Sequence, residues 1–240
     1  MFTVFEPNFG KLHFYGIRGI AHEWFKSYLS NRTQYVDYNG TKSSYLKVMC
    51  GVPQWSILGP ILFLLYINDL PNASNILHFI LFADDTNAFA TDKDLSVLNH
   101  IINIELIKLN DWFTANKLSV NTVKSCFILF GHKSKKYDSS LINLSMNGTV
   151  LSQVKHTKFL GVLIDENLSW SEHINLVTNK ISKSVGIICK LKHILPASVL
   201  HTLYNSLVLP YLNYCTLIWA SNKSYKLNKI LLIQKRLFGS

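Results

Sequence analysis

Residues 77–90 read Leu77-His-Phe-Ile-Leu-Phe-Ala-Asp-Asp-Thr-Asn-Ala-Phe-Ala90, and the rest of the chain is organised around them. Two apolar, strand-forming runs flank two adjacent carboxylates, Asp84 and Asp85. A polar pair between such runs predicts a β-hairpin with the acids at its tip. Paired carboxylates held by a sheet can bind divalent cations, because hard Mg²⁺ prefers oxygen ligands. An ordinary solvated turn can also contain two Asp, so the surrounding sequence has to separate the two interpretations.

The bulk composition indicates a folded chain with a substantial core. The 240 residues suit one large domain or two small ones, and 48% of them are hydrophobic, with a mean hydropathy of +0.17. The two most apolar runs, residues 57–70 and 207–220, are interrupted by prolines and polar residues and fall short of the ~20 residues of a spanning helix. The first residues lack the features of a signal peptide. We therefore expect no membrane segment.

The cysteines and histidines do not predict a metal centre. The four cysteines lie far apart without a C-x-x-C pair, and the nine histidines show no metal-binding spacing. We therefore expect no zinc site and a reduced, intracellular protein of the nucleus or the cytoplasm.

The chain is strongly basic, with a formal net charge of +10 and a sequence pI near 9.4. Residues 170–240 contain nine Lys or Arg and one acid, Glu172. Such a balance favours nucleic acid or another anionic partner, although it also suits the solvated faces of ordinary helices.

The first half of the chain predicts alternating helices and hairpins. Residues 19–30 carry apolar side chains four apart, as in an amphipathic helix. Asn39-Gly40 next to β-prone runs predicts a tight hairpin. Residues 61–70 form a predicted helix that is apolar on nearly all sides, so we expect complete burial and an end at Pro71. Asp94 is the predicted N-cap of a long helix that follows.

The second half changes character near residue 166. Before that point we expect strands at residues 126–130 and 159–165, the latter as one buried strand, and a hairpin at Asn147-Gly148. After it the pattern is helical, with predicted helices at residues 171–194, 196–208, 211–220 and 224–238. The fold class predicted from this order is α+β followed by an all-helical part.

Several segments together resemble the reverse transcriptases of non-LTR (LINE-like) retrotransposons, in that family's order and from about residue 11 to the end. The segments are Tyr15-Gly-Ile-Arg-Gly19, Gly51-Val-Pro-Gln-Trp-Ser-Ile-Leu-Gly-Pro60, Leu81-Phe-Ala-Asp-Asp-Thr86, Leu118-Ser-Val-Asn-Thr-Val-Lys-Ser125, Lys158-Phe-Leu-Gly-Val-Leu-Ile-Asp165 and Tyr211-Leu-Asn-Tyr214. The resemblance implies a right-hand polymerase palm and an N-terminally truncated domain. By it, residues 1–32 are a remnant of the fingers and the palm start, residues 33–166 the palm with the catalytic hairpin, and residues 167–240 a basic, thumb-like helical region.

The resemblance also implies roles for the hairpin. Asp84 is implied to be a metal ligand and Asp85 its companion carboxylate, for two Mg²⁺ ions or Mn²⁺ in their place. Phe82 and Ala83 are implied to form the wall beneath the primer end. Lys124 matches a lysine that neutralises or protonates the departing pyrophosphate, although alone it would be a solvated charge.

Two further sites are implied by the same resemblance. Gln54, with Trp55 beside it, lies in a loop that contacts the incoming nucleotide or the template; alone it would be a surface residue. Leu160 and Gly161 match the primer-grip turn, where glycine allows close backbone approach. Taken alone, that pair would be a kink in a core strand.

Two departures from the family pattern predict impaired catalysis. The family's palm uses a further Asp from an earlier strand, but residues 1–10 contain none; Phe2 and Phe5 stand where carboxylates belong, and Glu6 is the only acid there. Two cations held by one hairpin would repel each other, so we expect weakened metal binding. Trp55 stands where the family has glycine, adding volume and backbone cost near the template.

The expected function is RNA-directed DNA polymerisation by two-metal nucleotidyl transfer, with weak or no activity in this chain. The implied partners are an RNA template and a DNA primer, held in part by the basic helices of residues 170–240. One alternative is a non-catalytic protein that binds nucleic acid through those helices. Another is a genomic relic that is translated rarely or never.

Overall fold

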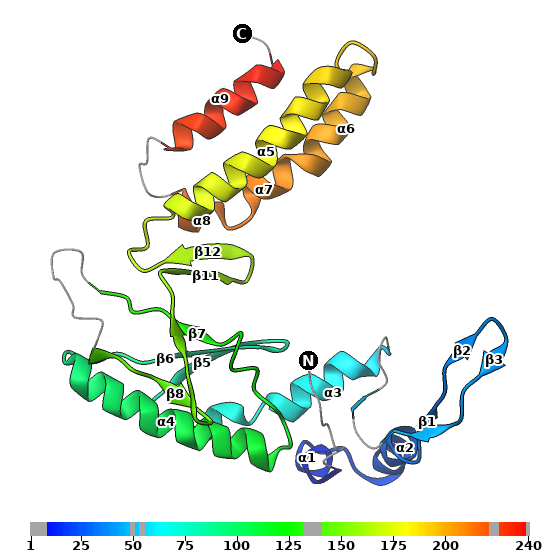
Figure 1. Ribbon diagram of the computed structural model, residues 1–240. Helices are drawn as coiled ribbons and strands as arrows, with labels where there is room; N and C mark the ends of the chain where they lie inside the picture. The colour runs from blue at the N-terminus through cyan, green and yellow to red at the C-terminus, as the bar shows by residue number, and fades with distance from the viewer. Residues whose placement is uncertain (1–8, 49–50, 53–55, 132–140, 221–225, 239–240) are drawn as a thin grey trace. The chain divides into compact units, whose positions relative to one another are not determined.

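The structure is a computed structural model that describes residues 9–48, 51–52, 56–131, 141–220 and 226–238 (Figure 1). Its contacts form two compact units, residues 1–125 with 139–151 and residues 126–138 with 152–240. Helices and strands are mixed, which confirms the α+β class. The second unit contains strands as well as helices, and the division into palm and thumb-like parts stays a prediction.

The first unit contains four α-helices, one 3₁₀ turn and eight short strands among its described residues. The helices are α1 (Phe9–Phe14), α2 (Gly19–Leu29), α3 (Leu58–Ile67) and α4 (Leu95–Ala115), with η1 at Leu70–Ala73. The strands are β1 (Thr33–Gln34), β2 (Asp37–Tyr38), β3 (Thr41–Lys42), β4 (Leu46–Lys47), β5 (His78–Phe82), β6 (Asp85–Phe89), β8 (Ser145–Met146) and β9 (Thr149–Val150).

Both predicted Asn-Gly hairpins are confirmed. β2 pairs antiparallel with β3, and Asn39 and Gly40 between them have φ of 51° and 81°. β8 pairs with β9 around Asn147 and Gly148, with φ of 50° and 71°. Two consecutive left-handed residues form the turn whose twist matches that of the flanking strands.

Helix α3 differs from the sequence-based prediction of complete burial. Leu62 and Tyr66 are buried, but Ile61 and Leu64 on the other side are 52% and 53% exposed. Apolar composition sets the tendency to bury a helix, whereas the neighbours that pack on it set how many faces are covered. Pro71 also does not end α3, because it lies inside η1.

Helix α4 confirms the predicted cap. The Asp94 side chain accepts hydrogen bonds from the backbone N–H groups of Ser96 and Val97, at 2.7 and 3.3 Å. These bonds satisfy donors that have no partner within the first helical turn. Leu98 and Leu109 of this helix are buried.

The second unit packs its strands against a helical cluster. Its strands are β7 (Cys126–Phe127), β10 (Ser152–Gln153), β11 (His156–Phe159) and β12 (Val162–Asp165). Its helices are α5 (Ser171–Leu191), α6 (Ala197–Leu207), α7 (Leu209–Asn213), α8 (Thr216–Trp219) and α9 (Lys226–Phe238). β7 pairs parallel with β10, whereas β11 pairs antiparallel with β12. The prediction of one strand over residues 159–165 was wrong, because the chain reverses at Leu160 and Gly161.

Helix α5 supplies the core of the second unit. Its buried apolar side chains recur three or four residues apart, at Ile174, Val177, Ile181, Val185 and Ile188. Val208, Trp219 and Ile230 from the following helices complete the cluster. Each fully buried side chain of this size contributes about 1.5–3 kcal/mol relative to exposure. In the parts of the chain that the structure describes, no helix is long and apolar enough to cross a membrane.

Candidate active site

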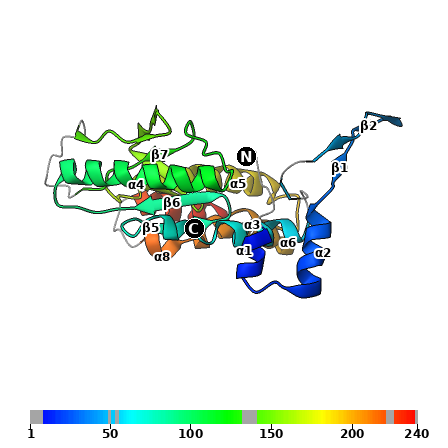
Figure 2. The same ribbon diagram turned by 90° about the horizontal axis from the view of Figure 1, so that it is seen from below.

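The predicted hairpin around Asp84 is present, with a two-residue turn. β5 and β6 pair antiparallel from His78 opposite Phe89 to Phe82 opposite Asp85, so Ala83 and Asp84 form the turn. Helix α4 lies alongside this hairpin in both ribbon views (Figures 1 and 2). Because Asp84 is in the turn, it lies at the tip of the hairpin, and Asp85 begins the returning strand.

The turn holds a conformation that alanine seldom adopts. Ala83 has a φ of 49°, in the left-handed region. Such conformations cost on the order of 1–3 kcal/mol and persist where the surroundings impose them. The hydrogen-bonded strands on both sides impose this conformation on Ala83. They also fix the backbone positions of Asp84 and Asp85.

The two carboxylates can offer oxygen ligands to a cation from solvent. Asp84 and Asp85 are both exposed. Their chemistry fits Mg²⁺, which binds through one or two carboxylates and keeps several waters. Among the described residues, no three His, Cys, Asp or Glu side chains gather into a metal-binding group. The hairpin thus provides two carboxylates from one element.

The side chains next to the acids are open to solvent. Phe82, the last residue of β5, is 60% exposed, and Ala83 is exposed beside it. An exposed aromatic ring next to paired carboxylates offers a flat apolar surface to a base or a sugar. The structure therefore brings together four of the predicted site residues on one turn.

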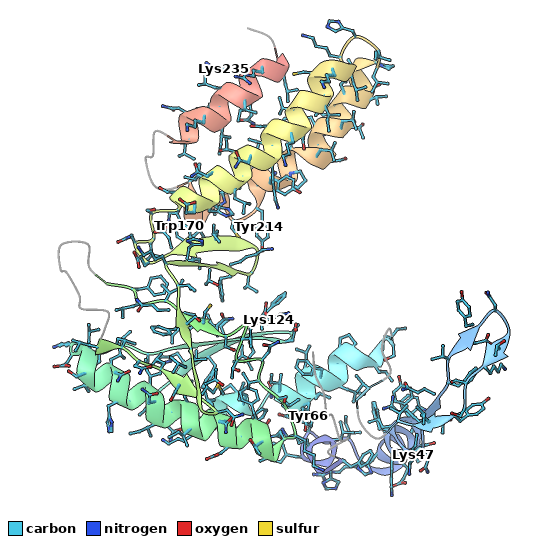
Figure 3. The ribbon with its side chains drawn as sticks, in the orientation of Figure 1. Lys47, Tyr66, Lys124, Trp170, Tyr214 and Lys235 are labelled. Carbon is cyan, nitrogen blue, oxygen red and sulfur yellow. The ribbon has the colours of Figure 1, made fainter. Side chains whose placement is uncertain are left out.

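Lys124 lies in the same compact unit as the hairpin (Figure 3). Its backbone N–H donates to the carbonyl oxygen of Asn121 at 3.1 Å, within a turn that follows α4. The Lys124 side chain is exposed. The lysine is thus presented to solvent from an ordered turn.

Gln54 and Trp55 lie outside the described residues, as do Phe2, Phe5 and Glu6. The described residues on either side of Gln54 and Trp55 make hydrogen bonds. The Arg32 guanidinium donates to the carbonyl oxygen of Gly51, and the Ser56 hydroxyl accepts from the backbone N–H of Gly59 at 3.0 Å. The arginine contact bridges 19 residues, so no local pattern predicts it.

Leu160 and Gly161 form the turn between β11 and β12, in the second unit. Their φ angles are 44° and 87°, and Phe159 and Val162 face each other across the strands. This is the two-residue turn geometry that favours Asn-Gly, here built with leucine in the first position. The interpretation of this pair as a strand kink is therefore wrong, and the pair is a hairpin tip.

Lys11, which no sequence pattern singled out, connects α1 to the C-terminal end of α3 and to Asp69 just beyond it. The Lys11 ammonium donates to Asp69 Oδ1 at 2.7 Å and to the carbonyl oxygen of Tyr66 at 2.8 Å. It also lies 4.9 Å from the centroid of the Trp112 ring. The partners are more than 50 residues away along the chain, so only the fold reveals the cluster.

Two buried polar residues of the second unit also escaped the sequence patterns. Burial opposes ionisation of Asp165, but hydrogen bonds from Ser169, Asn167 and Trp170 lower the pKa of its carboxyl below the usual value. Burial, and then the charge of Lys180, lower the pKa of His173. Both groups hold β12 to the start of α5, because Leu163 donates its N–H to His173 Nδ1 at 3.2 Å.

Comparison with known proteins identifies the family. A profile described as reverse transcriptase (RNA-dependent DNA polymerase) matches residues 5–164. The chain is 26% identical over 223 residues to the RNA-directed DNA polymerase from mobile element jockey of Drosophila melanogaster, covering 88% of this chain and 24% of that protein. It is 26% identical over 219 residues to the probable RNA-directed DNA polymerase from transposon X-element of the same species, covering 88% and 24%.

A third relative shows a similar level of identity. The retrovirus-related Pol polyprotein from type-1 retrotransposable element R1 2 of Nasonia vitripennis is 27% identical over 190 residues, covering 73% of this chain and 45% of that protein. The chain thus spans less than half the length of each of these relatives. With the profile matching two thirds of its residues and the carboxylate hairpin inside the match, the chain belongs to the reverse transcriptase (RNA-dependent DNA polymerase) family.

Proposed function

We propose that this chain is a polymerase palm with thumb-like helices that takes part in RNA-templated DNA synthesis, with weak catalysis of its own. The observation that carries the proposal is the pair of exposed carboxylates, Asp84 and Asp85, at the tip of a two-residue hairpin in a reverse transcriptase chain. An RNA template and a DNA primer are the proposed partners.

The hairpin residues have distinct proposed tasks. Asp84 and Asp85 supply the oxygen ligands, and Mg²⁺ held there would activate the primer hydroxyl and stabilise the leaving pyrophosphate. The exposed ring of Phe82 supports the primer end beside these ligands. Lys124 supplies positive charge for the departing pyrophosphate, and the Gln54 loop contacts the nucleotide or the template.

Weak catalysis follows from two features of the sequence. Phe2 and Phe5 stand where the family pattern has carboxylates, and Trp55 stands where that pattern has glycine. Incomplete coordination leaves the charge repulsion between two cations uncompensated, so the second cation binds poorly. Binding of a primed template before any reaction requires neither carboxylate, so we expect this binding to persist.

Primer extension on an RNA template with Mg²⁺ tests this function. We expect slow incorporation that is lost in Asp84→Ala and kept in Asp111→Ala, a matched exposed acid on α4. Robust incorporation by the wild-type chain would contradict the predicted weakness. Equal incorporation by Asp84→Ala and wild type would contradict the assignment of the site.

A second candidate function, nucleic-acid binding without catalysis, is favoured by the basic side chains of the helical unit. Within the described residues these are all exposed: Lys180, Lys183, Lys190, Lys192, Lys229, Lys235 and Arg236. Exposed cations release condensed counterions when they contact phosphates, so affinity falls steeply with salt. This candidate requires equal affinity in Asp84→Ala and wild type, and no incorporation by either protein.

A further inference from the structure

The hairpin tip at Leu160 and Gly161 is held by a residue from a distant helix. The Tyr214 hydroxyl donates to the carbonyl oxygen of Leu160 at 2.5 Å, across 54 residues of sequence (Figure 3). Both residues belong to the second compact unit. Tyr214 lies directly after α7, so the helical region contacts the turn itself as well as strand β12.

The tyrosine ring also limits what residue 161 can be. A Cβ atom added to Gly161 would lie 3.2 Å from Tyr214 Cε1 and 3.5 Å from the Tyr214 hydroxyl oxygen. Gly161 also has a φ of 87°, which disfavours any side chain. Glycine is therefore favoured at this position, chiefly by its backbone angle and also by the close approach of the Tyr214 ring.

Tyr214 is itself fixed through both of its backbone groups. Its N–H donates to the carbonyl oxygen of Pro210 at 3.1 Å, and its carbonyl oxygen accepts from Trp219 Nε1 at 2.8 Å. Trp219 is 2% exposed and lies in the α5 core cluster. The ring of Tyr214 is thus placed by the packed interior of the helical unit.

The returning strand is anchored to the same interior. Leu163, on β12, donates its backbone N–H to His173 Nδ1. The His173 ring meets the Trp219 ring edge-on, with centroids 5.6 Å apart. Two independent bonds, at Leu160 and at Leu163, therefore hold the hairpin to residues that surround one buried tryptophan.

The turn needs such support because its first residue is a leucine. Leu160 has a φ of 44°, where the Cβ of an L-residue crowds its own backbone. Conformations of this kind persist only when the surrounding structure imposes them. The Tyr214 hydroxyl bonds the carbonyl of this same residue, so it acts where the backbone is least favourable.

The chemistry of the tip suits a phosphate backbone. Gly161 is exposed and carries no side chain, so a polymer can approach the main chain closely. Lys158, two residues before the turn, is exposed and positively charged. A cation beside an open stretch of main chain attracts and orients a nucleic-acid strand.

We propose that Tyr214 is a positioning residue that sets the Leu160–Gly161 turn in the one orientation that accepts the 3′ end of a primer strand. The inference rests on the proposed function and adds a residue that acts on the primer through the turn.

Three variants of the full chain test the proposal. Tyr214→Phe removes the hydroxyl and keeps the ring, whereas Tyr211→Phe, in neighbouring α7, is the matched control. The third is Leu160→Asn in the Tyr214→Phe background. It creates Asn-Gly, the sequence that adopts this turn without outside support, and should therefore restore the turn geometry.

Hydrogen exchange of the amides of residues 159–163 reports the turn, and anisotropy with an RNA–DNA duplex reports primer binding. The duplex has a recessed DNA 3′ end, and a blunt duplex of equal length is compared. Loss of one hydrogen bond should accelerate exchange and weaken preference for the recessed end by about 2- to 10-fold in Tyr214→Phe. Tyr211→Phe should match wild type, and Leu160→Asn should restore both readouts.

Each contrary result has a defined meaning. Exchange in Tyr214→Phe equal to that in Tyr211→Phe overturns the proposal, since the tyrosine then does not hold the turn. Faster exchange with unchanged preference for the recessed end also overturns it, because the support then serves stability alone. Failure of the proposed catalysis is separate: a chain without incorporation but with these binding differences keeps this inference.

Discussion

His173 Nδ1 lies 3.2 Å from the backbone nitrogen of Leu163 and accepts its hydrogen bond, which joins β12 to α5. An acceptor nitrogen carries no proton, so this bond requires the neutral imidazole. Burial and the nearby charge of Lys180 both lower the pKa of His173, which keeps the ring neutral in the folded chain.

The first prediction concerns stability against pH. The folded pKa of His173 lies below its unfolded value of about 6.5, so the unfolded chain binds the additional proton. The stabilisation is present above that unfolded pKa and is lost as pH falls toward the folded pKa. Melting temperatures between about pH 7.5 and pH 5.5 should fall more for wild type than for His173→Asn, which keeps an acceptor but does not titrate. His193→Gln, at an exposed position, should follow wild type.

The second prediction concerns Asp165, a buried carboxylate that organises the start of α5. It accepts from the N–H groups of Asn167, Ser169 and Trp170 at 2.9–3.1 Å. Asp165→Ala removes a charged acceptor from three partly buried backbone donors and should lower the free energy of unfolding by about 2–3 kcal/mol. Urea unfolding measures this difference. Glu172→Gln, at an exposed acid of the same helix turn, should cost much less.

The stabilisation by Asp165 also depends on pH. Like that of His173, it decreases as the pH falls, but here hydrogen bonds rather than burial lower the pKa. Hydrogen bonds hold the pKa of Asp165 below its usual value, so its stabilisation is present above the unfolded pKa of about 3.9 and is lost as pH falls through the folded pKa. Below about pH 3.9 the wild-type chain and Asp165→Asn should therefore converge in stability. Parallel loss in both proteins would contradict this assignment.

The third prediction concerns the buried Glu105 of α4. Its Oε1 accepts from Lys108 Nζ at 2.7 Å, and its Oε2 is buried without a hydrogen-bond partner among the described residues. Removing the cation leaves a buried carboxylate with only the Ser74 side chain as a hydrogen-bond partner, so Lys108→Met should cost about 2 kcal/mol. Replacing the acid by an apolar residue of similar length removes the penalty, so Glu105→Met should be close to neutral. Urea unfolding of both variants and of the double variant tests this order.

The fourth prediction concerns Trp55, at a position where the family resemblance implies glycine. Trp55→Gly should strengthen binding of a primed RNA template and raise incorporation, because it restores backbone freedom and removes the indole. Trp55→Ala removes the same volume without that freedom, so it separates the two causes. If both variants match wild type in anisotropy and in primer extension, Trp55 does not limit this chain.

The fifth prediction concerns salt. If α5 contacts phosphates, removal of Lys183 or Lys190 should reduce the slope of log affinity against log salt by about one for each phosphate that is no longer neutralised. Glutamine keeps side-chain length, so Lys183→Gln and Lys190→Gln are the variants of choice. Lys42→Gln, on the exposed β3 of the other unit, provides the comparison. Slopes unchanged in both α5 variants would exclude these lysines from the interface.

Much of the local structure was predictable because it depends on neighbours in sequence. The two Asn-Gly turns and the Asp94 cap follow from backbone preferences and side chains within a few residues. The hairpin of Asp84 was predictable for the same reason. Sequence patterns failed at Leu160 and Gly161, where a turn has leucine in a position that local preference gives to asparagine or glycine.

The remaining features depend on residues that meet only after folding. Half-exposure of α3, support of Leu160 by Tyr214, and the neutral His173 come from contacts between distant segments, and no local pattern records them. The amino-acid sequence by itself determined the family and the paired carboxylates, because these reside in short segments with strong local preferences. Tertiary structure alone decided which turns are held and which polar groups are buried, because burial and long-range hydrogen bonds exist only once the chain has packed.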